Sequence, residues 1–140
     1  MLKESIILGI DPGTNIMGYG VIHIGPQGIE TLALGIVNMQ KIKDPYRKMS
    51  HILEHMFDLL DTYKPDAMAI ESPFYSKNVQ SMLKLGRAQG VAMAAALSRN
   101  VPVCEYAPRK IKLAITGKGA ASKEQVAAML KGMLHFSQEP

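Results

Sequence analysis

The sequence predicts an α/β domain in which helices pack against a mixed sheet of five strands, three of them antiparallel. Residues 5–39 alternate between apolar runs and turns rich in Gly and Pro, which is typical of short strands. From residue 46 the apolar residues recur every three or four positions, which is the helical period. Two further short apolar runs then alternate with helical segments, and this order indicates a sheet with helices against it.

The amino-terminal part is expected to form three strands joined by turns. Residues 5–10 are apolar and stop at the turn-forming residues 11–15. Residues 17–25 resume with β-branched and aromatic side chains, and residues 29–39 follow a Gly-Pro-Gln-Gly turn. Connections this short can join antiparallel neighbours but not parallel ones. We therefore expect an antiparallel meander.

The rest of the chain is expected to alternate helices with strands. Helices are expected over residues 46–63 and 76–99, after Pro108, and from Lys123, and strands over residues 67–71 and 101–106. Lys64-Pro65-Asp66 should stop the first helix, Asn100 should end the second, and Ser122 with Gln125 should cap the last. The inner side of the second helix is expected to carry Met82, Leu83, Leu85, Gly86, Ala88, Gly90, Val91 and Ala94.

Length and composition fit one globular domain over residues 1–140. The chain is 47% hydrophobic and 20% charged, and no apolar run approaches the ~20 residues that cross a bilayer. No cleavage-site pattern follows the first apolar run, so a cytoplasmic location is expected. Cys104 is the only cysteine, which excludes an internal disulfide and a cysteine metal cage. The four histidines lack the spacing of a zinc site.

Charge is distributed unevenly along the chain. Residues 1–71 hold six Lys/Arg and nine Asp/Glu, whereas residues 72–123 hold nine Lys/Arg and only Glu105 as an acid. A basic stretch beside an acidic one suits a protein that binds a polyanion and keeps carboxylates for a cation. A solvated surface of uneven charge would give the same pattern, so the asymmetry alone favours nucleic acid only modestly.

Two carboxylates, Asp11 and Glu71, each close an apolar run of similar build. If the two strands pair side by side, the carboxylates meet, and their repulsion calls for a cation between them. Oxygen ligands select a hard divalent ion, Mg²⁺ or Mn²⁺. Taken singly, each acid could equally be a strand-end turn residue, as in Asp-Pro-Gly.

The motifs around these acids resemble those of RuvC-type Holliday junction resolvases. The first motif is carried by residues 9–14 and 18–21, and the second by residues 69–74 and 77–78. The resemblance continues through residues 83–90, 105–109 and 122–123, so it covers nearly the whole chain. It implies an RNase H-like fold, a homodimer, paired symmetric incisions in four-way junction DNA, and a branch-migration motor of RuvA and RuvB as partner.

The resemblance also implies site residues. Asp11 would bind or bridge two Mg²⁺ ions ~3.5–4 Å apart, and Glu71 would ligate one of them, so that positioning and charge stabilisation lower the barrier. Phe74 would stack on an unpaired base, worth ~1–3 kcal/mol, although a core phenylalanine is the alternative. Lys112 and Lys123 match basic positions near the family's active site. The residues expected to contact DNA phosphates are Lys77, Lys84, Arg87, Arg109, Lys112, Lys118 and Lys123.

One departure from the family pattern concerns the acids. The family has one or two further acids near the start of a last helix, and the sequence stops at Pro140 before that run. The acids after Glu71 are Glu105, Glu124 and Glu139, and none matches a catalytic position. We therefore expect a domain truncated at its carboxyl end, which binds metal weakly and cuts poorly or not at all.

Three alternatives remain open at this point. A non-catalytic junction-binding module would fit the missing acids. An ATP-binding domain of the actin and sugar-kinase type also begins with an Asp-Gly-Thr turn, but a complete member needs two such domains. The loop Thr116–Gly119 fails the spacing of a phosphate-binding loop. An RNase H-like nuclease acting on another nucleic acid is the third.

Overall fold

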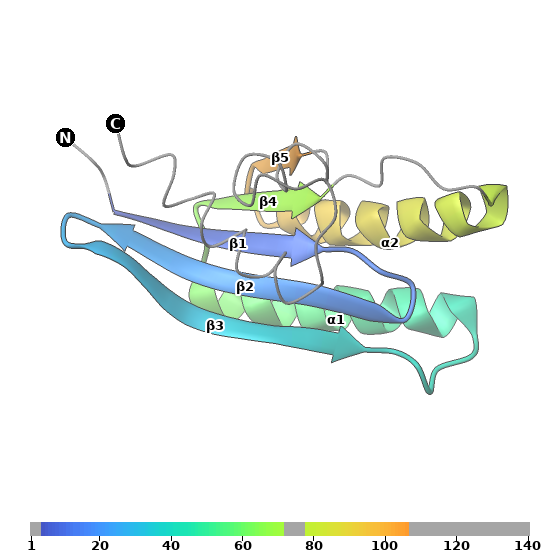
Figure 1. Ribbon diagram of the computed structural model, residues 1–140. Coiled ribbons are helices and arrows are strands. Elements are labelled where there is room, and N and C mark those ends of the chain that lie inside the picture. Colours follow the sequence, from blue (N-terminus) through green and yellow to red (C-terminus); the bar gives the residue numbers. More distant parts are fainter. Residues whose placement is uncertain (1–3, 72–77, 107–140) are drawn as a thin grey trace.

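The computed structural model describes residues 4–71 and 78–106, which form one sheet and two helices (Figure 1). The elements are β1 (Ser5–Asp11), β2 (Ile16–Gly25), β3 (Gly28–Asn38), α1 (Pro45–Tyr63), β4 (Ala67–Glu71), α2 (Val79–Ser98) and β5 (Val103–Tyr106). The sheet order is β3-β2-β1-β4-β5, with β1, β2 and β3 antiparallel and with β4 parallel to both β1 and β5. The predicted mixed sheet is confirmed. The helices predicted after Pro108 and from Lys123 lie outside the described residues.

The antiparallel half extends slightly further than the sequence pattern predicted. Pairing of β2 with β3 runs from Ile16–Asn38 to Gly25–Gly28, so each strand begins one residue early. The two-residue turn between them is followed by Gly28 at φ +123°, a region that side chains with a Cβ rarely occupy. The glycine therefore permits the tight hairpin.

Helix α1 is fixed at both ends by capping groups. Asp44 adopts an extended conformation and its Oδ1 accepts a hydrogen bond from Tyr46 N at 2.9 Å. Pro45 takes the first helical position, where a missing N–H costs nothing. At the other end, Lys64 is left-handed (φ 48°) and its N–H donates to Leu60 O. The predicted start at Tyr46 was one residue late because the Asp44 cap lies outside the apolar period.

We expect Asp44→Ala to lower the free energy of unfolding by about 0.5–2 kcal/mol, because the Tyr46 N–H loses its acceptor. Urea denaturation followed by circular dichroism measures the difference. Asp58→Ala, which removes an exposed acid from the middle of α1, is the matched control and should change stability by less than about 0.5 kcal/mol. Equal effects of the two substitutions would show that the cap contributes nothing.

Helix α2 begins three residues later than the predicted Ser76. Asn78 is extended (φ −114°, ψ 118°), and its Oδ1 accepts hydrogen bonds from Gln80 N and Ser81 N. A residue that caps the first turn in this way stands outside the helix. The predicted terminator Asn100 is confirmed, since it lies just past the helix in the left-handed region (φ 60°).

The inner side predicted for α2 is wrong at four of its eight positions. Ala88 is buried as expected, but Leu83, Gly86, Gly90 and Ala94 are exposed. The buried residues are Ala88, Ala92, Ala95 and Ala96. The amino-terminal half of α2 extends past the carboxyl end of β4 (Figure 1), so its apolar residues have no strand beneath them. In the carboxyl-terminal half, alanines let the helix pack closely.

Both helices lie on one face of the sheet (Figure 1), and the hydrophobic core fills the layer between the sheet and the helices. On β1 and β4 the core residues are Leu8, Ile10, Met68 and Ile70. Three further methionines, Met17, Met39 and Met56, belong to the same core, where their flexible side chains can fill irregular gaps. Neither helix in the described ranges is long and apolar enough to cross a membrane.

Candidate active site

Asp11 and Glu71 are the last residues of two adjacent parallel strands. The last register pair that joins β1 to β4 is Ile10–Ile70, and each carboxylate is the next residue of its strand. Neighbouring strands lie ~4.8 Å apart, so the two side chains leave the sheet at the same level. The prediction that these strand ends come together is confirmed.

The two carboxylates belong to the sheet face opposite the helices. Leu8 and Ile10 of β1 face the core, and side chains alternate along a strand, so Asp11 faces the other way. The same alternation on β4 places Glu71 on that side. Both residues are partly buried, and the Oε2 atom of Glu71 is shielded from solvent.

A pair of hydrogen bonds sets the register of β1 against β4. Ile6 N donates to Asp66 Oδ2 at 2.8 Å, and Asp66 N donates to Ile6 O at 2.7 Å. These bonds join the beginnings of the two strands, and five residues later the strands deliver the carboxylates side by side. In the sequence, Asp66 stood out only as part of a helix stop, so this second role was missed.

Two glycines of β2 leave the sheet surface beside Asp11 without side chains. Gly18 pairs with Asp11 and Gly20 pairs with Gly9. A Cβ on Gly18 would lie 3.6 Å from Asp11 Cβ and 3.9 Å from its Oδ2, so any longer side chain would fill the space beside the carboxylate. A bulky ligand can therefore approach Asp11 from the β2 side.

The donor set fits a hard divalent cation. Mg²⁺ is commonly held by one or two carboxylates and completes its shell with water and phosphate oxygens. Asp11 and Glu71 supply those two carboxylates. Within residues 4–71 and 78–106 no cluster of three or more His, Cys, Asp or Glu side chains could hold a metal, so these residues do not form a closed zinc site.

Only part of the predicted DNA-contact set lies within the described residues. Lys84 and Arg87 stand on α2. Phe74, Lys77, Arg109, Lys112, Lys118 and Lys123 lie outside the described residues, as do Glu124 and Glu139. Glu105 pairs in register with Ile70, on the core-facing side, and accepts a hydrogen bond from Gln89 Nε2 at 3.0 Å. It therefore points away from the two strand-end carboxylates.

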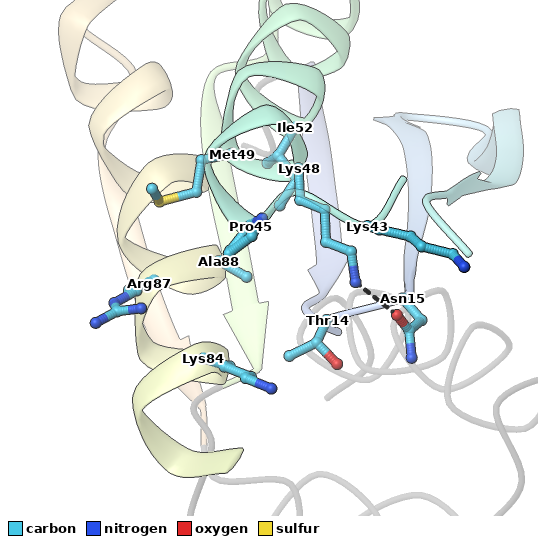
Figure 2. Close-up of a pocket in the computed structure, with 10 residues that line it drawn as sticks. All are labelled: Thr14, Asn15, Lys43, Pro45, Lys48, Met49, Ile52, Lys84, Arg87 and Ala88. Atoms are coloured by element: carbon cyan, nitrogen blue, oxygen red, sulfur yellow. Dashed lines mark hydrogen bonds between the residues drawn. The ribbon is translucent and has the colours of Figure 1, made fainter. Parts of the chain in front are cut away.

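Lys84 and Arg87 line a pocket between the two helices and the β1–β2 loop (Figure 2). Lys43, in the segment before α1, and Lys48, in the first turns of α1, also line this pocket. Neither was predicted as a site residue. Residues 1–71 are acidic as a whole, which hid a local basic cluster. Lys41, Lys43, Arg47 and Lys48 stand within eight residues against one acid, Asp44.

The comparisons with known proteins agree with this geometry. The sequence model of a family described as crossover junction endodeoxyribonuclease RuvC matches residues 7–140. The chain belongs to the RuvC family. A RuvC family member of Bacteroides fragilis, named crossover junction endodeoxyribonuclease RuvC, is 62% identical over 138 residues, which span 99% of this chain and 73% of the relative. A relative of the same name from Christiangramia forsetii is 57% identical over 99% of this chain and 72% of its own.

Solved structures of RuvC share the fold. The structure of T. thermophilus RuvC in complex with Holliday junction substrate superimposes with a TM-score of 0.77 at 31% identity, over 92% of this chain and 79% of that one. The yeast mitochondrial Holliday junction resolvase Ydc2 has a TM-score of 0.59 at 17% identity, over 80% of this chain and 56% of its own. The expected RNase H-like fold is thus confirmed. RuvC family members are metal-dependent nucleases.

Proposed function

We propose that this RuvC family chain is a Holliday junction resolvase. It binds a four-way DNA junction and hydrolyses one phosphodiester in each of two strands, in symmetric positions. The observation that carries this proposal is the placement of Asp11 and Glu71 in adjacent register positions at the end of β1 and β4. Family membership supplies the substrate class, since the relatives are named for the crossover junction.

Asp11 and Glu71 would hold the metal in this proposal, each as a carboxylate ligand. A divalent ion held there, Mg²⁺ or Mn²⁺ and two per complete site, would supply an activated water and would neutralise charge on the leaving 3′ oxygen. The protein's own contribution is to fix two carboxyl groups on rigid strands. The glycines beside Asp11 leave room for the sugar–phosphate backbone to reach them.

The remaining predicted contacts belong to the same proposal. Lys84 and Arg87 neutralise phosphates of the junction arms. Phe74 stacks on an unpaired base at the junction centre, and Lys112 and Lys123 contribute charge near the cut site. A motor of RuvA and RuvB is the partner that the family implies.

The exposed face of α2 supports a homodimer. Val79, Leu83, Gly86, Gly90 and Leu97 recur at helical spacing and are all exposed on the side of the helix opposite its buried alanines. Glycine within a helix costs about 1 kcal/mol relative to alanine. An added Cβ at Gly86 or Gly90 would meet nothing within 4 Å in this chain. The same face of a second copy could pack closely against these positions.

We expect Leu83→Lys to convert the dimer to a monomer, because it places a charge in the middle of this stripe. Light scattering after size-exclusion chromatography measures the mass. Leu34→Lys is the matched control, since Leu34 on β3 is similarly exposed (60% against 56%). A dimer that survives Leu83→Lys, or that is lost equally in Leu34→Lys, would place the dimer contact elsewhere.

The substrate is tested by competition. A labelled four-way junction should be displaced by unlabelled junction at far lower concentration than by duplex DNA or an RNA–DNA hybrid. Preference for the hybrid would support an RNase H-like nuclease acting on another nucleic acid. Calorimetric binding of ATP without any junction binding would support the ATP-binding alternative.

A further inference from the structure

The pocket between α1, α2 and the β1–β2 loop is built by four parts of the chain. Thr14 and Asn15 come from the loop, Lys43 from the segment before α1, Pro45, Lys48, Met49 and Ile52 from α1, and Lys84, Arg87 and Ala88 from α2. Its volume is about 180 Å³. Buried Ile52 and Ala88 form an apolar floor, and the polar groups surround the mouth (Figure 2). We call it the α1–α2 basic pocket.

Among the residues that the structure describes, four cations and no acid line the α1–α2 basic pocket. Lys48 and Lys84 extend toward the space beside Thr14, and Lys43 and Arg87 flank it (Figure 2). None of the four forms an ion pair with an acid of the described ranges. Charges of one sign that share a cavity repel one another, and an anion placed among them removes that cost.

Arg99, at the carboxyl end of α2, offers a comparison, because it is a cation with a structural role. At the far end of the helix its Nε lies 2.9 Å from Asp61 Oδ1, and this hydrogen bond lowers the pKa of the Asp61 carboxyl below its ordinary value. Its guanidinium also lies 4.1 Å from the centre of the Phe57 ring. Lys84 has no comparable carboxylate partner among the described residues.

Lys48 is held in place by the β1–β2 loop. Its Nζ donates to Asn15 Oδ1 at 2.8 Å, and the side chain is partly buried (Figure 2). An ammonium group has three donors, so two remain for an anion. Because the position is already fixed, binding costs less side-chain entropy.

We propose that the α1–α2 basic pocket binds a backbone phosphodiester of the junction within roughly three nucleotides of the one that is cut, an inference that rests on the proposed function. Thr14 follows Asp11 by three residues, so the pocket lies within about 11 Å of chain from the metal ligand. That length corresponds to roughly three nucleotide steps along one strand. None of the described residues that line it is aromatic, which favours sugar and phosphate over a stacked base at these residues.

The test is the salt dependence of junction binding, measured by fluorescence anisotropy of a labelled four-way junction over a KCl series in EDTA. Each phosphate contact contributes about −0.9 to the slope of log K against log [KCl]. Lys48→Ala and Lys84→Ala should each make the slope less steep by about that amount, and Lys48→Arg should retain it. Lys41→Ala is the matched control, because Lys41 is exposed and does not line the pocket.

Asn15→Ala separates positioning from charge. It leaves Lys48 charged but free, so affinity should fall by roughly 2- to 12-fold, the equivalent of ordering one side chain, with the slope unchanged. A less steep slope in Asn15→Ala would show that Asn15 does not act through Lys48. Thermal unfolding of each variant verifies the fold, and Lys84→Ala, at an exposed position, keeps the test decisive if Lys48→Ala unfolds.

The outcomes separate this inference from the proposed function. If the unsubstituted protein binds the junction and both lysine variants keep its slope, or share their change with Lys41→Ala, the pocket proposal is overturned and the proposed function stands. If the unsubstituted protein does not bind the junction, both fail. Calorimetry with inorganic phosphate and with ATP distinguishes the source of the phosphate. Saturable binding of either below about 1 mM that is lost in Lys84→Ala, with an unchanged junction slope, would overturn the phosphodiester assignment.

Discussion

Asp11→Asn is expected to slow cleavage of a four-way junction by at least about 10²–10³-fold, the loss seen when one group that stabilises transition-state charge is removed. The amide keeps the shape of the side chain but not its charge, so the strand pairing of β1 is retained while the cation is held by Glu71 alone. Junction affinity in EDTA should stay within about threefold of the unsubstituted protein, because phosphate contacts provide most of the binding. Glu71→Gln should behave in the same way.

Cleavage of a labelled junction in Mg²⁺ and in Mn²⁺ measures the rate, and calorimetric titration with Mn²⁺ measures the metal site directly. The titration carries the comparison if cleavage by the unsubstituted protein is slow. Asp58→Asn, an exposed acid on α1, is the control and should alter neither quantity. Unchanged cleavage in Asp11→Asn would refute the catalytic assignment. Junction binding with neither cleavage nor Mn²⁺ binding in any form would support the non-catalytic module.

Ile70→Ala is expected to lower the free energy of unfolding by about 2–5 kcal/mol, the range for truncating a fully buried aliphatic residue. Ile70 is 0% exposed and belongs to the core cluster between the sheet and the helices. Total stability of a domain is only about 5–15 kcal/mol, so this single change removes a large part of it. Since Ile70 also precedes Glu71, loosening of β4 should weaken metal binding as well.

Ile36→Ala is the matched control, because it makes the same chemical change on β3 at a position that is 57% exposed. It should shift stability by less than about 0.5 kcal/mol. Urea denaturation measures both changes in the free energy of unfolding, provided that its dependence on urea concentration is the same in each variant. Comparable losses at the two positions would mean that the β3 surface is covered in solution or that β4 is not a core strand.

The position of each carboxylate at a strand end could be predicted because each acid directly follows an apolar run. The parallel pairing of β1 with β4, which brings the two strand ends together, joins residues far apart in the chain and could only be assumed from the sequence. The helix cap at Asp44 and the left-handed conformation of Asn100 also depend on neighbouring residues. Of these two helix ends, the sequence pattern predicts only the one at Asn100.

The α2 surface and the α1–α2 basic pocket depend on tertiary placement instead. Helical spacing shows which residues of α2 share a side, but not that half of the helix runs past the sheet and leaves Leu83 exposed. The pocket exists because the start of α1 approaches both Asn15 and α2, contacts that link residues far apart in the chain. Lys48 was not predicted as a site residue, because the charge was summed over residues 1–71 and that segment is acidic as a whole.

The mutual hydrogen bonds between Ile6 and Asp66, which join residues 60 positions apart, have a consequence for the order in which the protein is made. During synthesis the β1–β2–β3 meander can pair through short-range contacts as soon as it leaves the ribosome. The β1–β4 pairing must wait until α1 and β4 have followed, because closing the longer loop comes later. Asp11 therefore remains without Glu71 beside it throughout that interval, so a nascent chain carries no assembled cutting centre.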